Sequence, residues 1–254
     1  MPTPPADDVF DAHFHIIDKR FPLVANNGFM PDEFSVADYR AHSAELGITG
    51  GVVVSGSFQE FDDTYLVDAL ETLGQSFVGV VNVADDATDD DLLRLASAGV
   101  RGVRFNLYRG GSAGLDSVAT LGRRAWDVAG LHSEFYLDAH DLDTLEPLLA
   151  SLPKVSIDHL GMTSANRDAL LRLVSAGVHV KATGFGRVDL DVASTVAEIH
   201  AANPAALMFG TDLPSTRART PFRPADITLL TEALPTGARA ALHDNAAAFY
   251  GLSA

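Results

Sequence analysis

The chain has 254 residues, and with 47% hydrophobic and 20% charged residues it can bury a sizeable core, which excludes an intrinsically disordered chain. Acidic residues outnumber basic ones by 34 to 18, and the formal charge of −16 disfavours binding to nucleic acid or to anionic membrane surfaces. The absence of cysteine excludes disulfides, thiol catalysis and cysteine-bound metals. With no signal-peptide pattern and no apolar run of membrane length, a cytoplasmic protein is expected.

Short β-branched runs alternate with amphipathic stretches along the whole chain. In chain order, strands are predicted at 9–17, 51–57, 77–84, 100–108, 134–140, 154–160, 178–184 and 207–213. Helices are predicted between and after them at 36–46, 65–73, 89–98, 117–129, 144–152, 166–176, 190–202, 224–233 and 236–249. Four glycines stand at expected helix ends: Gly47, Gly99, Gly130 and Gly177.

This alternation predicts parallel strands joined by right-handed crossovers. The length fits a (β/α)8 TIM barrel of the α/β class, which takes about 250 residues. The lack of an internal repeat or linker favours one domain over residues 1–254. An open doubly wound sheet is the structural alternative, but it usually has a glycine-rich phosphate turn where this chain has His-Phe-His.

Titratable residues gather where three predicted strands end, and this end of a barrel carries function. Side-chain alternation along the first strand predicts that Asp11, His13 and His15 share one face. His159 ends the sixth strand and Asp212 ends the eighth. Each residue alone also fits a structural role, as a satisfied core histidine or a capping carboxylate. Their joint position favours a site that binds a metal or polarises a substrate carbonyl.

Arginines occur near the same strand ends. Arg104 lies within the apolar fourth strand, where a charge needs a buried partner, Arg109 follows that strand, and Arg187 follows the seventh. A cationic site in an acidic protein favours an anionic substrate, most simply a carboxylate. Arg217 and Arg219, in the loop after the eighth strand, are interpreted either as substrate contacts or as solvated loop charges.

Two further polar residues end strands. Ser57 ends the second strand, but no GxSxG elbow surrounds it, so we expect it to donate a hydrogen bond rather than act as a nucleophile. His140 ends the fifth strand, either as a metal ligand or as a loop residue that is hydrogen-bonded locally.

Three motifs together resemble those of the amidohydrolase superfamily, in particular its amidohydrolase-related proteins. They are Asp-Ala-His-Phe-His at 11–15, Ile-Asp-His-Leu-Gly at 157–161 and Gly-Thr-Asp-Leu-Pro at 210–214. The resemblance runs over essentially the whole chain to Asn-Ala-Ala-Ala-Phe-Tyr-Gly at 245–251, where Ala246 replaces the usual proline.

Other segments are more similar to the 2-pyrone-4,6-dicarboxylate lactonase branch of that superfamily. They are Gly-Val-Arg-Phe-Asn at 102–106, Val-Val-Ser-Gly-Ser at 53–57 and the stretch 181–187. This resemblance implies a hydrolase that opens a carboxylated lactone, such as 2-pyrone-4,6-dicarboxylate or a sugar lactone. The implied partner is a small carboxylated substrate, and the oligomeric state is left open.

The residues implied for this reaction form two groups. Asp212 would be the general base that activates water, and His13, His15 and His159 would polarise the carbonyl and stabilise the oxyanion. The substrate carboxylates would be held by arginines, with a serine and a tyrosine as secondary contacts: Arg104, Arg109, Arg187, Ser57 and Tyr136.

The resemblance implies two alternatives for the metal. Binuclear members of the superfamily carry a carboxylated lysine on the fourth strand, where this chain has Arg104, which argues against a binuclear centre. The lactonase branch works without metal, whereas many relatives bind one zinc, and here His13, His15 and Asp212 would be its ligands. We expect that no metal is required, with a single divalent ion such as zinc as the alternative.

Two other functions fit the same residues. A metal-dependent decarboxylase of an aromatic or unsaturated acid uses the same paired histidines, strand-six histidine and strand-eight aspartate, but it needs a tightly held divalent ion. An inactive barrel that only binds carboxylates needs no general base, so the presence of Asp212 argues against it.

Overall fold

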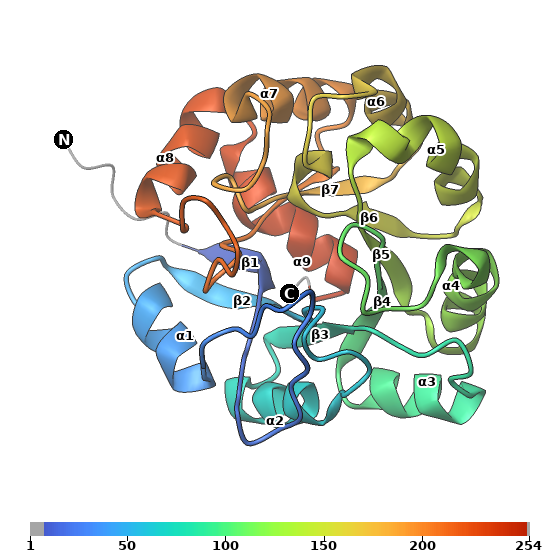
Figure 1. The fold of residues 1–254 in the computed structure, drawn as a ribbon. Helices are drawn as coiled ribbons and strands as arrows, with labels where there is room; N and C mark the ends of the chain where they lie inside the picture. The colour runs from blue at the N-terminus through green and yellow to red at the C-terminus, as the bar shows by residue number, and fades with distance from the viewer. Residues whose placement is uncertain (1–7, 253–254) are drawn as a thin grey trace.

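Eight parallel strands alternate with helices around a barrel in the computed structural model, which describes residues 8–252 (Figure 1). The strands pair in the order β1 to β8: β1 (Val9–Phe14), β2 (Ile48–Val54), β3 (Phe77–Val81), β4 (Val100–Asn106), β5 (His132–Tyr136), β6 (Val155–Ile157), β7 (His179–Ala182) and β8 (Leu207–Phe209). The (β/α)8 TIM-barrel prediction is confirmed. The ends of the predicted 1–254 domain, residues 1–7 and 253–254, lie outside the described residues.

The helices form the outer ring, close to where the apolar periodicity predicts them. They are α1 (Val36–Ser43), α2 (Thr64–Leu73), α3 (Asp89–Ser97), α4 (Leu115–Ala129), α5 (Leu142–Ser151), α6 (Arg167–Ser175), α7 (Val192–Ala202) and α8 (Pro224–Ala233). The helix predicted at 236–249 is a π-helical turn, η3 (Ala240–Asp244), followed by α9 (Asn245–Tyr250). The four glycines predicted at helix ends all have positive φ angles, from 67° to 104°.

The strands are shorter than predicted at the end where the polar motifs lie. The predicted first, sixth and eighth strands run to residues 17, 160 and 213, whereas β1, β6 and β8 end at Phe14, Ile157 and Phe209. The backbone turns into the left-handed region at His159 (φ 51°) and at Asp212 (φ 59°), which no strand can continue through. His15, His159 and Asp212 therefore lie just beyond the strands, whereas His13 lies on β1.

A break in the register of β1 divides its polar side chains between the two faces of the barrel wall. The pairing of β1 with β2 shifts between Asp11 and Phe14, as expected of a β-bulge. The Asp11 carboxylate points outward to the hydroxyl of Tyr39 on α1, whereas His13 points inward to Asp158. The prediction that Asp11 shares a face with His13 and His15 is therefore wrong, because simple alternation does not anticipate a bulge.

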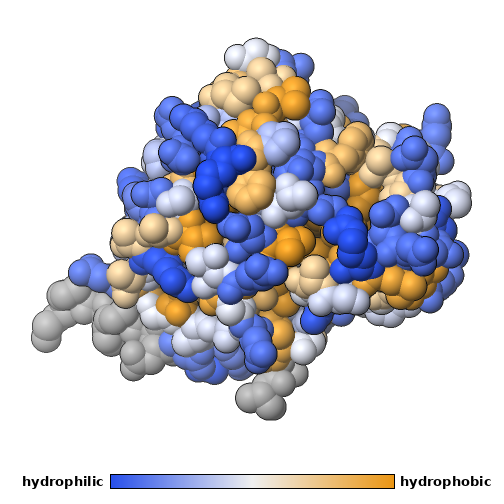
Figure 2. All heavy atoms as spheres, turned by 90° about the horizontal axis from the view of Figure 1, so that it is seen from below, coloured by the Kyte–Doolittle hydropathy of each residue, from blue (hydrophilic) through white to orange (hydrophobic). Residues whose placement is uncertain are grey.

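The barrel interior has an apolar layer at the N-terminal ends of the strands, which α9 covers (Figure 1). This layer is formed by side chains from β1, β2, β3, β8 and α9: Phe10, Ala12, Val52, Val54, Val78, Val80, Met208, Ala246, Ala247, Phe249 and Tyr250. Figure 2 shows mainly hydrophilic side chains on one side of the molecule, with apolar areas between them. No described helix combines the length and apolar character of a membrane span.

Candidate active site

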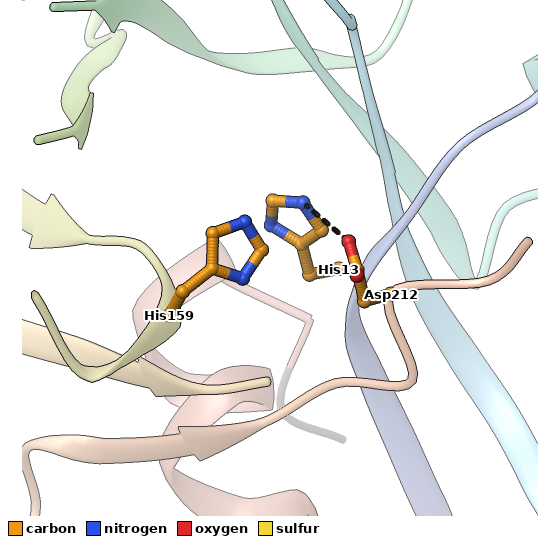
Figure 3. Close-up of side chains that lie close together, drawn as sticks. All are labelled: His13, His159 and Asp212. Atoms are coloured by element: carbon orange, nitrogen blue, oxygen red, sulfur yellow. Dashed lines mark ion pairs between the residues drawn. The ribbon is translucent and has the colours of Figure 1, made fainter. Parts of the chain in front are cut away.

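Four side chains predicted at the ends of three strands meet at the C-terminal mouth of the barrel. Asp212 Oδ1 lies 3.8 Å from His13 Nε2 and 3.6 Å from His15 Nε2. The centroid of the His159 ring lies 4.9 Å from that of His13, and Figure 3 shows the His13 ring between the His159 ring and the Asp212 carboxylate. All four residues are buried. The structure thus brings together the residues that the strand ends predict.

Each inward-facing carboxylate near these histidines is paired with a buried cation. Arg187 donates through Nε to Asp212 Oδ2 at 2.9 Å, and a second guanidinium nitrogen also donates to that oxygen. Arg104 donates to Asp158 Oδ2 at 2.7 Å and to the Ser55 carbonyl oxygen at 2.7 Å. Two of the arginines predicted to hold substrate are therefore already bound to protein carboxylates, which sequence spacing does not reveal.

A further buried ion pair lies deeper in the barrel, between Lys181 and Glu134, and sequence reasoning missed it. Lys181 Nζ on β7 is 2.5 Å from Glu134 Oε2 on β5, and Glu134 Oε1 is 4.0 Å from His13 Nδ1. Both side chains are fully buried. The signal was present in the sequence, because a charged residue inside an apolar strand needs a buried partner. Here each residue is the partner of the other.

The charged states of the site follow from burial and from these pairs. Burial alone would raise the pKa of Asp212, but the Arg187 guanidinium and the neighbouring imidazoles hold it well below its ordinary value. Burial, together with the nearby Arg187 guanidinium, lowers the pKa of His159 to about 3, and burial takes the pKa of His13 well below 6.5. At neutral pH the site therefore contains an ionised aspartate and uncharged His13 and His159 rings.

The ring orientations define which nitrogen atoms present lone pairs to Asp212. His15 Nδ1 is 2.7 Å from the Val54 carbonyl oxygen, which only accepts, so the proton of a neutral His15 ring lies on Nδ1. His13 Nδ1 similarly faces a carboxylate oxygen of Asp158 at 3.3 Å. Both Nε2 atoms are then acceptors directed at the Asp212 carboxylate. A water molecule at this point can donate one hydrogen bond to the Asp212 carboxylate and the other to one of the two Nε2 atoms.

A pocket opens beside these residues and contains every predicted substrate-binding side chain. It is lined by residues on β4 and β5 and in the loops after β1, β2, β4, β6, β7 and β8: His15, Gly56, Ser57, Phe58, Arg104, Asn106, Arg109, Tyr136, His159, Arg187, Thr216 and Arg217. The Tyr136 hydroxyl and His159 Nδ1 are buried and have no hydrogen-bond partner among the described residues. Such groups are expected to bind a ligand or water.

Three residues whose roles the sequence left open differ in whether they line this pocket. Arg217 lines the pocket, lies 4.3 Å over the Phe29 ring and donates to Asn26. Arg219 donates to the Val188 carbonyl oxygen and does not line that pocket. His140 is exposed and does not line it either.

Two groups of donor atoms lie close enough together for a metal ion. One is His13, His159 and Asp212, and the other is His13, Glu134 and Asp158. The first shares two residues with the predicted zinc set of His13, His15 and Asp212. The three carboxylates are however each neutralised by Arg187, Lys181 or Arg104, so a divalent ion would add two positive charges with no free carboxylate to offset them.

Comparisons with known proteins identify the family of the chain. A model of the amidohydrolase family matches residues 10–252. The chain is 32% identical over 156 residues to the 2-pyrone-4,6-dicarboxylate hydrolase of Comamonas testosteroni, covering 59% of this chain and 51% of that relative. The match therefore spans about half the length of that relative. The chain is 28% identical over 239 residues to the 4-sulfomuconolactone hydrolase of Rhizobium radiobacter, covering 85% and 79% of the two chains.

Solved structures show the same fold. A probable 2-pyrone-4,6-dicarboxylic acid hydrolase from Acinetobacter baumannii, crystallised with citric acid, superposes with a TM-score of 0.81 at 22% identity, covering 96% of this chain and 99% of that one. A crystal structure from Agrobacterium tumefaciens gives a TM-score of 0.82 at 23% identity and covers 99% and 98%. At these identities the likeness concerns the fold.

Proposed function

The chain belongs to the amidohydrolase family, and from this premise we propose that it is a hydrolase that opens a carboxylated lactone. The observation that carries the proposal is the meeting of an ionised Asp212 with the lone pairs of His13 and His15 beside an arginine-lined pocket. The names of the two relatives describe hydrolases of a pyrone dicarboxylate and of a sulfomuconolactone, which are both anionic cyclic esters.

Asp212 is the general base of the proposed reaction. A water molecule that donates one hydrogen bond to Asp212 and the other to His13 or His15 adds to the lactone carbonyl carbon, and Asp212 accepts its proton. The ring C–O bond then breaks, and the proton passes from Asp212 to the departing oxygen. A carboxylate with so low a pKa is a weak base on its own. A substrate carboxylate beside Arg187 offsets the guanidinium charge and thereby raises the pKa of Asp212 while substrate is bound.

His159 is assigned to the carbonyl oxygen, because its ring reaches the pocket and has a free polar atom. His13 and His15 instead orient the water, since their Nε2 atoms accept hydrogen bonds when their protons lie on Nδ1. The three histidines, to which the sequence resemblance gives one shared role, are thus given two roles: His13 and His15 orient the water, and His159 binds the carbonyl oxygen. Hydrogen bonds aimed at the developing oxyanion are among the largest contributions to acyl transfer.

Substrate carboxylates are assigned to the arginines around the pocket, with Ser57 and Tyr136 as secondary contacts. Arg109 is the strongest candidate, because among the described residues it has no carboxylate partner, whereas Arg104 and Arg187 do. Arg104 and Arg187 each retain one face toward the pocket and contribute positive potential there.

No metal is included in the proposal, because the charge balance of the buried pairs does not fit a further divalent ion. If zinc does bind, His13, His15 and Asp212 would hold it, and it would activate water and polarise the carbonyl. The cytoplasmic location expected from the sequence stays a prediction.

The test is to incubate the protein with a panel of lactones and to follow product mass by mass spectrometry and the release of protons as the new carboxylic acid forms. Wild-type protein should add one water to 2-pyrone-4,6-dicarboxylate or a carboxylated muconolactone, and a neutral lactone of the same ring size should react about 100-fold less efficiently, as expected when a charge-assisted contact is lost. Release of carbon dioxide would instead identify a decarboxylase. Binding of the anionic lactones without any change in mass would identify an inactive carboxylate-binding barrel.

A further inference from the structure

We propose that Asp11 is a positioning residue that holds the general base Asp212 in place across the seam of the barrel. This inference rests on the proposed function of Asp212. The described strands pair from β1 to β8, and no ladder joins β8 back to β1, although two backbone hydrogen bonds cross this seam beyond the strand ends, from Asp212 N to the His13 carbonyl oxygen at 2.7 Å and from His15 N to the Leu213 carbonyl oxygen at 2.8 Å. His13 lies on one side of this seam and Asp212 on the other, so the relative position of the two residues depends on what bridges it.

The Asp11 carboxylate bridges the seam through four donors. Its Oδ1 accepts from the backbone N–H of Thr211 at 2.8 Å and of His13 at 3.3 Å. Its Oδ2 accepts from the Thr211 hydroxyl at 2.7 Å and from the Tyr39 hydroxyl at 3.0 Å. Asp11 is fully buried. The β1 bulge directs this carboxylate away from the pocket, so it does not reach substrate.

Asp11 is connected through Thr211 to the residues on both sides of Asp212 in the chain. The Thr211 side-chain oxygen also accepts from the Leu213 backbone N–H at 3.2 Å. The residues before and after Asp212 are thus tied to Asp11, and Asp212 N itself donates to the His13 carbonyl oxygen at 2.7 Å. This support stabilises Asp212 in a left-handed conformation that is unfavourable for a side chain other than glycine.

We call the hydrogen bonds of Asp11 with Thr211, His13 and Tyr39 the clamp. The seam between β8 and β1 is closely packed next to it. A Cβ atom on Gly210 would lie 2.7 Å from the backbone nitrogen of His13, so the end of β8 approaches β1 more closely than any larger residue allows. Asp212 Oδ1 is then 3.6 Å and 3.8 Å from the His15 and His13 Nε2 atoms. A displacement of about 1 Å at such a site can cost about 100-fold in rate.

An aspartate is needed at this position because all four of its partners are donors. An ionised carboxylate accepts from two backbone N–H groups and from two hydroxyls, whereas the NH2 group of an asparagine accepts nothing and would leave the Thr211 and Tyr39 hydroxyl protons without this acceptor. The clamp should therefore act on the rate of the chemical step. It should not act on substrate affinity, which depends on pocket arginines that do not contact Asp11.

The test replaces the Thr211 hydroxyl while keeping the shape of the side chain. In Thr211→Val, kcat should fall about 10- to 100-fold while KM changes less than about twofold, because water activation is misaligned and the pocket is intact. Thr211→Ser restores the hydroxyl and should recover kcat to within about threefold of wild type. The matched control is Thr195→Val in α7, where an equally buried threonine hydroxyl donates to the Asp191 carbonyl oxygen far from the site, and its kcat should be unchanged.

Rates are referred to the folded fraction, measured by circular dichroism. A Thr211→Val protein with wild-type kcat, or one whose loss equals that of Thr195→Val, would overturn the proposal, as would a rise in KM at unchanged kcat. If Thr211→Val does not fold, Asp11→Asn serves in its place, with the same expected loss of kcat and the same contradicting results. Failure of the proposed function looks different, because the wild-type protein would then hydrolyse no anionic lactone.

Discussion

The two ends of the barrel interior contain different kinds of side chain. At the N-terminal end, apolar side chains such as Phe10 and Met208 pack against α9. At the C-terminal end, buried carboxylates pair with Arg104, Lys181 and Arg187. The short strand β8 takes part in both, since Met208 lies on it and Asp212 follows it.

This difference separates stability from chemistry. Burial of apolar area contributes to folding at about 25 cal/mol per Å2, whereas a buried ion pair roughly balances its own desolvation. The charged end therefore adds little to stability, and its presence is explained by the proposed chemistry. Substitutions at the two ends of β8 should accordingly affect different measurements.

The largest effect is expected for Asp212→Asn at the charged end. It keeps the shape of the side chain but removes the proton acceptor, so kcat should fall by about two to four orders of magnitude. KM should change far less, because the arginines still face the substrate. Steady-state kinetics on a carboxylated lactone measures this, with the exposed Asp116→Asn as control. A loss of less than tenfold would exclude Asp212 as the base.

The next effect is expected at the apolar end of the same strand. Met208 is fully buried, and Met208→Ala should lower the free energy of unfolding by about 2–5 kcal/mol through lost transfer energy and a cavity. The kinetic constants of the folded protein should stay at wild-type values. Urea unfolding and kinetics on one preparation check both points. A large change in kcat at unchanged stability would break the separation between the two ends.

Much of this architecture could be predicted from the sequence, because strand–helix alternation and polar residues at strand ends are local signals. His13, His159 and Asp212 were found in this way, and the structure brings them together. Strand ends were predicted too far along the chain, since polar residues such as Asp212 continue an alternating pattern until the backbone turns. The outward direction of Asp11 depends on a bulge that arises only when β1 pairs with β2.

The partners of the buried charges could not be predicted. Glu134 and Lys181 are far apart in the sequence and meet only when β5 and β7 take their places around β6. Arg187 and Asp212 likewise meet only when the loops after β7 and β8 lie side by side. Sequence patterns place charges on strands and loops, but they do not say which of them neutralise each other. The structure therefore changes the expected role of Arg187 most, from a substrate contact alone to the partner of Asp212, the proposed general base.

A smaller effect is expected at the rim of the charged end. Arg109 lines the pocket and lies 5.2 Å from the Tyr108 ring, without a carboxylate partner among the described residues. Arg109→Met should raise KM by an amount equivalent to about 1.5–3 kcal/mol, as for a charge-assisted hydrogen bond. Stability should be unchanged, and the exposed Arg123→Met serves as control. An unaltered KM for anionic lactones would remove Arg109 from the substrate contacts.

Acid should destabilise the charged end through its neutral histidines. The pKa of His159 is about 3 in the folded chain against 6.5 when unfolded, so between these values the unfolded state binds the extra proton and stability falls as pH falls. Asp11, whose pKa burial raises to about 6, acts in the opposite direction between pH 6 and 3.8.

The His159 contribution can be isolated by comparing two proteins. Between pH 7 and 5 the free energy of unfolding of wild type should fall by about 2 kcal/mol more than that of His159→Gln, which has no imidazole to titrate. Urea unfolding at both pH values measures the two differences. Equal pH dependence in the two proteins would show that His159 titrates normally in the folded chain.

The account depends most on the idea that Arg187, Arg104 and Lys181 already supply the positive charge of the site. The direct test measures bound metal and lactone turnover on the same chelator-treated sample. Elemental analysis should find less than about one-tenth of an equivalent of divalent metal while kcat stays at the untreated value, because water is activated by Asp212 alone. Activity lost with the metal and recovered on adding zinc would contradict this account and identify a zinc enzyme.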